Sequence, residues 1–190
     1  DRAVRTAVVA NEGPVILADQ GNNTAGGSPG DGTALLEAFK EMIWPDAALF
    51  IRDSEAVRKC IEVGVGGEVE LLVGGKVDTL HGEPVLCRGM VKLVSDGRFR
   101  SSHSGTNINM GQTAVLECGR TQIAITEHPT SQIEPAYFRS VGIEPKEKKI
   151  IVVQSAHLFR HEFQVVEHIP KRVIEVDSPG GTSPNLNRFN

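Results

Sequence analysis

Hydrophobic residues along the chain occur in short unbroken runs that alternate with stretches of helical spacing. Residues 14–19 form an apolar run that predicts a buried strand, and a glycine-rich stretch follows it. Residues 33–42 carry apolar positions three and four apart, which indicates a helix, and residues 47–52 are apolar again. Residues 53–63 return to helical spacing, and Gly64 ends the pattern. This part of the chain therefore predicts strand, helix, strand and helix in that order.

The middle of the chain changes to strand-like runs separated by turn residues. A meander of antiparallel strands is expected over residues 69–126. Its last hairpin turns at Gly119-Arg120, and Gly89 predicts a bulge in an earlier strand. The meander thus separates two regions in which strands and helices alternate.

The last third resumes the alternation of strands and helices. Its expected elements are a short helix over 134–139, a strand over 149–154, a helix over 155–166 and a strand over 172–176. We therefore predict an α/β fold, with a mixed β-sheet, flanking helices and a central antiparallel β meander.

The length of 190 residues fits one domain. Residues 1–10 are typical of the last turns of a helix from a preceding segment, and residues 178–190 form an irregular tail rich in Gly, Pro and Asn. We expect one domain over 1–190, cut from a longer protein.

Composition excludes several classes of function. The formal net charge is −4 and aromatic residues make up 5% of the chain, so we expect neither a basic surface nor a base-stacking surface, and no nucleic-acid partner. No apolar run is long enough to span a bilayer, so we expect no membrane partner. Three widely spaced cysteines form no zinc-binding pair and favour reduced thiols in a cytoplasmic protein.

The glycine-rich stretch is the main candidate site. A strand, a glycine loop and a helix N-terminus in this order favour binding of an anion, because backbone amides and the helix dipole can meet there. The spacing from Gly21 to Ser28 is close to that of a P-loop, but Gly27 stands where the lysine belongs, which excludes nucleotide hydrolysis. Asp19 closes the strand before the loop, where ligands of open α/β sheets bind.

A pair of histidines gives a weaker signal. His157 and His161 would share one helix face and could hold a metal. The zincin order of His-Glu-x-x-His is absent, however, and no third ligand is evident. We therefore expect no metal ligands in this chain. Arg160, between the two histidines, could bind a carboxylate with two parallel hydrogen bonds.

The order of several short motifs resembles the C-terminal domain of the MlrC (microcystinase C) family of metallopeptidases over nearly the whole chain. The motifs lie at residues 13–21, 26–33, 64–67, 109–116, 138–145, 149–156, 159–160 and 177–180. The chain departs from the family pattern at Asn22 to Ala25, at Gln154 where a lysine is usual, and at Leu158 where a histidine is usual. These departures lie in the glycine loop, at the end of the strand expected over 149–154 and in the helix expected over 155–166.

The resemblance implies an accessory domain of a zinc peptidase that acts on small peptides or other anionic substrates. The zinc would belong to an N-terminal domain, which is the implied partner, and this chain alone would be inactive and would carry no cofactor. The cleft would be lined by residues of the loop and by one arginine, namely Asp19, Gln20, Gly26, Gly27, Asp31 and Arg160. Two alternatives are a non-catalytic module that binds an anionic metabolite at the loop and a purely structural domain.

Overall fold

A mixed sheet of eight strands forms the centre of the domain, in the order β10-β1-β9-β2-β8-β7-β4-β3. The computed structural model describes residues 2–185 and 187. The strands of this sheet are β1 (Val15–Asp19), β2 (Ala47–Arg52), β3 (Glu68–Val73), β4 (Val85–Ser95), β7 (Thr113–Cys118), β8 (Thr121–Thr126), β9 (Ile150–Val153) and β10 (Arg172–Val176). A separate hairpin pairs β5 (Arg98–Arg100) with β6 (Asn107–Asn109).

The sheet has a parallel and an antiparallel half. Strands β10, β1, β9, β2 and β8 run parallel to one another, and Val15 of β1 pairs with Ile150 of β9. From β8 onward, β7, β4 and β3 pair antiparallel. The predicted α/β fold with a mixed sheet is confirmed, and so is the central antiparallel meander.

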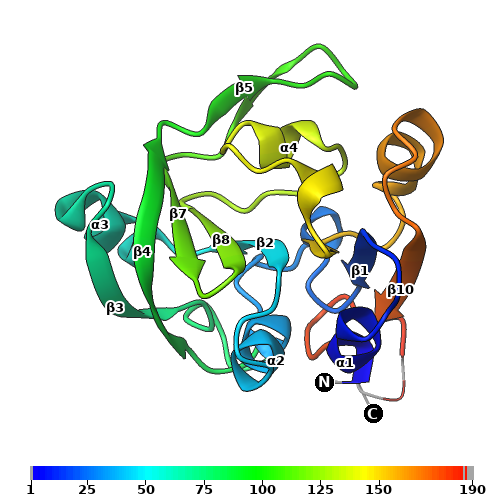
Figure 1. Ribbon diagram of the computed structural model, residues 1–190, viewed down its shortest axis with the longest axis horizontal. Coiled ribbons are helices and arrows are strands. Elements are labelled where there is room, and N and C mark those ends of the chain that lie inside the picture. Colours follow the sequence, from blue (N-terminus) through cyan, green and yellow to red (C-terminus); the bar gives the residue numbers. More distant parts are fainter. Residues whose placement is uncertain (1, 186, 188–190) are drawn as a thin grey trace.

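Helices cover both faces of the parallel half. The helical segments are α1 (Arg2–Val8), η1 (Thr24–Gly26), α2 (Ala34–Glu41), α3 (Ser54–Val63), α4 (Ala136–Arg139), η2 (Pro145–Glu147) and the π-helical turn η3 (His161–Val166). In Figure 1, α1 and α2 lie on one side of the sheet and α4 on the other. None of the described helices has the length and apolar character needed to cross a bilayer.

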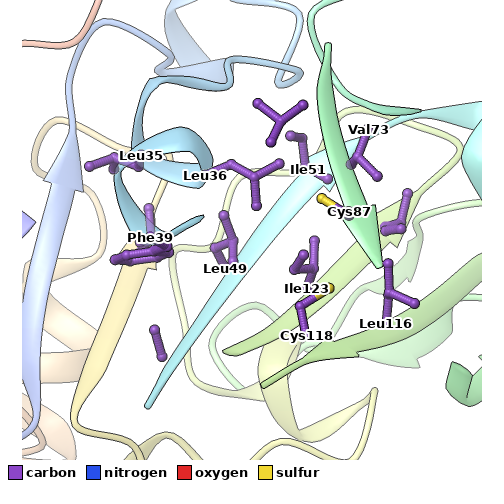
Figure 2. Packing of buried hydrophobic residues seen from close by; sticks show 14 of the residues in the cluster. Leu35, Leu36, Phe39, Leu49, Ile51, Val73, Cys87, Leu116, Cys118 and Ile123 are labelled. Atoms are coloured by element: carbon purple, nitrogen blue, oxygen red, sulfur yellow. The ribbon is translucent and has the colours of Figure 1, made fainter. Parts of the chain in front are cut away.

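Alternating strand positions supply the two cores. Val15 and Leu17 of β1 face the side of α1, α2 and α3, whereas Ile16 faces the side of α4 and η3. Figure 2 shows the first core, where Leu36 of α2 packs with Leu49 and Ile51 of β2. Because both faces are covered, β1 is buried at all five positions and reads in the sequence as an unbroken apolar run.

Two predicted elements are wrong in detail. The helix expected over 155–166 is helical only from His161, because the chain after β9 first turns toward the face of the sheet that α4 covers. In this turn the amide of Arg160 donates to His157 O. The bulge lies between Val91 and Leu93 rather than at Gly89. A Cβ at Gly89 would stand 2.2 Å from Glu117 O, so this glycine permits close approach of β4 and β7.

The two ends of the chain agree with the sequence analysis only as far as they are described. Helix α1 matches most of the expected helix over 1–10, and the described tail after β10 contains no strand. Residues 1, 186 and 188–190 of the predicted segments lie outside the described residues.

Candidate functional site

The parallel strands all end at one edge of the sheet, and the glycine loop lies along it. The chain leaves β1 toward α2 on one face, and it leaves the neighbouring β9 toward η3 on the other face. Such a divergence between adjacent parallel strands is where α/β sheets bind ligands. Asp19 ends β1 and Gln154 follows β9, so both stand at this point.

Asp19 joins the loop to the tail that follows β10. Its carboxylate accepts a hydrogen bond from the hydroxyl of Ser178 and one from the backbone of Asn22. Burial of the carboxyl, which these hydrogen bonds and His81 only partly offset, raises the pKa of Asp19 to about 6. A Cβ on Gly21 would lie 2.1 Å from Ser178 O, which shows how closely the tail crosses the loop.

The loop uses its own amides internally. The amides of Gly26 and Ser28 donate to Asn23 O, and the amide of Gly27 donates to Thr24 O. Next to the loop, the amide of Thr33 at the N-cap of α2 donates to His81 O at 3.0 Å. The expected anion cradle is therefore wrong for these amides, which the fold itself satisfies.

Asp31 organises the connection between β3 and β4. One of its carboxylate oxygens accepts hydrogen bonds from the amides of Lys76 and Val77, each at 2.9 Å. Asp53 acts beside it, capping α3 through Ala56 N and forming an ion pair with Lys76 at 2.9 Å. These two carboxylates fix the start of the segment that carries His81 over the glycine loop.

His81 is the central residue that the sequence analysis missed. Its Nδ1 lies 2.8 Å from Asp78 Oδ1, and its Nε2 lies 3.3 Å from Ser28 Oγ and 3.3 Å from the amide of Gly181. Since the Gly181 amide donates to Nε2, the ring proton is assigned to Nδ1. The hydrogen bond from His81 holds the pKa of Asp78 below its usual value. Only the short Asp-x-x-His spacing could have indicated this pair.

Ser28, His81 and Asp78 are connected in the same sequence as the residues of a nucleophilic triad, but the Ser28 hydroxyl has other hydrogen-bond partners. Its hydroxyl lies 3.0 Å from Gly21 O and 2.9 Å from Thr182 Oγ1, and the side chain is buried. Nucleophilic catalysis needs a hydroxyl that a substrate can reach. The geometry instead supports a tie between the loop, the His81 segment and the tail.

A pocket of about 240 Å³ opens beside this tie. Its walls are Gly26 to Pro29 of the loop, Asp78, Leu80 and His81 of the β3–β4 segment, and Gly181 and Thr182 of the tail. Gly26 and Gly27 are exposed there, so these two predicted site residues are accessible to a ligand. Both ring nitrogens of His81 already have partners, so the pocket offers no ligand set that fits a metal.

The other predicted site residues lie differently. Gln20 is half-buried, and its backbone bonds to Val176 and Thr182. Arg160 pairs with Glu175 at 2.7 Å and donates to Gln164 at 3.1 Å. In the described part of the chain no hydrogen bond or ion pair joins Arg160 to the glycine loop, so its guanidinium would have to leave Glu175 to bind a substrate carboxylate.

Of the departures from the family pattern, Gln154 has a clear structural role and Leu158 lies at the surface. Gln154 is buried, and its side-chain amide donates to Gly30 O at 3.0 Å and to Phe50 O at 3.1 Å, which links the loop to β2. Leu158 is exposed in the turn before η3, and so is His157, which therefore shares no helix face with His161.

Fold and pocket together define an α/β domain with a small pocket beside the carboxyl edge of its parallel strands. The model of the MlrC C-terminus family matches residues 17–190, and the chain belongs to this family.

Two relatives extend this assignment. Microcystinase C from Sphingomonas sp. is 30% identical over 161 residues, which cover 84% of this chain and 32% of that protein. A crystal structure of a provisionally assigned metallopeptidase from Mesorhizobium sp. BNC1 is 26% identical with a TM-score of 0.88, and the match covers 99% of this chain and 38% of that one. The chain thus spans about a third of the length of these relatives.

Proposed function

We propose that this chain is the cleft-forming accessory domain of a metal-dependent peptidase acting on small peptides, and that a zinc ion is held by an N-terminal domain joined to it. The observation that carries the proposal is the pocket between Gly26-Gly27, His81 and the tail, at the ligand-binding edge of an MlrC-family domain. In this arrangement the chain's own residues shape the cleft and exclude water, while the metal supplies the activated water when it is bound.

The internal bonds of the site suit a wall rather than a catalytic centre. Asp19, Asp31 and His81 each hold another segment of the fold in place. Such ties fix the exposed glycines of the loop within the small tolerance that substrate positioning requires. Substrate contact would therefore fall on the accessible edge at Gly26, Gly27 and Leu80.

The first test compares this chain alone with the protein that contains it and the proposed N-terminal domain. We expect the chain alone to hydrolyse no small peptides, and the longer protein to hydrolyse them in a way that a chelator abolishes and zinc restores. Hydrolysis by the chain alone would contradict the proposal, and so would activity of the longer protein that persists after complete removal of metal.

The second test examines the pocket. Leu80 lines the pocket and is 61% exposed, so Leu80→Trp should narrow it without disturbing the core. In the longer protein that contains the N-terminal domain, we expect KM for a small peptide to rise at least fivefold, which corresponds to about 1 kcal/mol. The melting temperature should not change. Leu86→Trp on β4 is the matched control, because Leu86 is 44% exposed and does not line this pocket. Equal effects of the two variants would refute a substrate wall at Leu80.

A further inference from the structure

Two distant segments meet outside the glycine loop, at the tip of the β5–β6 hairpin. In Figure 1 the tip of this hairpin reaches toward the helical turn η3. There Nδ1 of His103 and Nδ1 of His161 each lie 2.7 Å from the same oxygen, Oε1 of Glu162. Two imidazoles from separate elements thus converge on one carboxylate.

Buried Glu134 fixes the hairpin tip that carries His103. The amide of His103 donates to Glu134 Oε2 at 2.9 Å, and the hydroxyl of Ser102 donates to the same oxygen at 2.5 Å. Within the tip, the amide of Ser104 donates to Ser101 Oγ at 3.0 Å. The backbone around His103 is therefore held before any ligand arrives, which lowers the entropy that binding would cost.

The other two residues are fixed by the π-helical turn. Phe163, next to Glu162, is fully buried in the core against α4 and the sheet. The Glu162 side chain is 12% exposed, while His103 is 46% and His161 is 63% exposed. The carboxylate thus forms the floor of the cluster and the two imidazoles form its rim. Widened π turns of this kind occur often at functional sites.

The local charge favours a cation. Glu162 brings one carboxylate oxygen to 2.7 Å from an imidazole nitrogen of both His103 and His161. Glu134 adds a second, fully buried carboxyl group directly behind His103, and its Oε1 has no hydrogen-bond partner among the described residues. A divalent ion at the rim would be attracted to the carboxylate of Glu162 that forms the floor of the cluster.

We propose that His103, His161 and Glu162 form a binding site for Zn²⁺ or a similar late first-row divalent ion, with water completing the coordination. Two imidazole nitrogens and one carboxylate oxygen are a ligand set that suits zinc and does not suit Mg²⁺ or Ca²⁺. This proposal revises the expectation that the chain holds no metal ligands.

The distances are compatible with such a site. Ligand atoms about 2.0 to 2.1 Å from a tetrahedral zinc are about 3.3 Å apart. The three candidate atoms all lie within 4.8 Å of one another. The separations would change by up to about 1.5 Å, which two exposed imidazoles can accommodate by rotating their rings without disturbing the core.

Isothermal titration calorimetry, in which zinc chloride is added to the metal-free 190-residue chain, tests the proposal. We expect one saturable site, and Co²⁺ should give the visible absorption bands of a tetrahedral complex. His161→Ala and Glu162→Gln should each weaken zinc binding at least tenfold, with near-ultraviolet circular dichroism unchanged in the absence of metal. His157→Ala is the matched control, because His157 is also exposed and lies outside the cluster; it should bind as the unmodified chain does.

Several outcomes would overturn the proposal. Absence of saturable zinc binding is one, and unchanged affinity in both His103→Ala and His161→Ala is another. Equal loss in His157→Ala, or several weak equivalents of zinc per chain, would show adventitious binding to exposed histidines only. If Glu162→Gln alters the fold, the histidine variants still decide the question, since both imidazoles lie at the surface.

Discussion

Replacing Asp19 by asparagine should change how the stability of the domain depends on pH. The carboxyl group of Asp19 is buried at the carboxyl edge of the sheet, and its pKa rises from 3.8 to about 6. Between these two pH values the unfolded chain releases the proton of Asp19 while the native domain retains it. The native state then binds more protons, so the free energy of unfolding falls as pH rises through this window.

The magnitude follows from the same shift. A difference of about 2 pKa units between about 6 and 3.8 corresponds to about 3 kcal/mol. This loss of unfolding free energy is absent well below pH 3.8, the pKa of Asp19 in the unfolded chain. It grows from about pH 4 and is complete once the pH exceeds the native pKa of about 6. Asp19→Asn removes the titration but keeps an oxygen that can accept the hydrogen bond of Ser178. The variant should therefore lose less stability than the unmodified chain as pH rises.

Urea unfolding of both proteins at intervals from pH 4 to pH 8 measures this effect. The quantity of interest is the unfolding free energy of Asp19→Asn minus that of the unmodified chain, because other titrating groups largely cancel in it. We expect this difference to increase by about 2.4 kcal/mol from pH 4 to pH 7, the larger part of the full shift, and then to level off. A difference that stays constant, or that decreases as pH rises, would refute the assignment of a buried, weakly acidic Asp19.

Three further results are expected. Gly21→Ala should destabilise the domain by about 3 kcal/mol in urea unfolding, because its Cβ would stand 2.1 Å from a backbone oxygen. Gly27→Ala should cost only about 1 kcal/mol, because its Cβ would meet open space and only the φ of +102° is unfavourable. Equal losses in the two variants would contradict this distinction. Cys60, whose pKa burial raises to about 11, should react with a disulfide reagent at pH 8 only after unfolding, and rapid native labelling would disprove it. His81→Ala should speed hydrogen exchange of the Gly181 amide, which donates to His81 Nε2, and unchanged exchange would exclude the tie.

The sequence already indicated much of the fold because its local patterns agree with the tertiary structure. The apolar run of β1 and the helical spacing of α2 are properties of neighbouring residues, and each predicted its element to within a residue or two at either end. The start of the helix before β10 was placed too early, because the turn from Ser155 to Arg160 is set by where the chain must cross the sheet edge. No local pattern encodes that crossing.

The candidate sites divide in the same way. The sequence indicated that Asp19 and the exposed Gly26-Gly27 pair lie after a strand, at an edge suited to ligands. It could not show that His81 covers this loop, since the hydrogen bond to Ser28 spans 53 residues. Nor could it join His103 to Glu162, which are 59 residues apart.

By itself, then, the sequence determined the strands of the main sheet, most helices, the mixed character of that sheet and the position of the glycine loop, because hydrophobic periodicity and turn residues act over a few positions. Only the tertiary structure decided that β9 lies between β1 and β2, that the amides of Gly26, Gly27 and Ser28 are satisfied within the loop, and that histidines and carboxylates from distant segments converge. Those outcomes depend on the pairing of strand edges and the packing of two cores, which involve residues far apart along the chain.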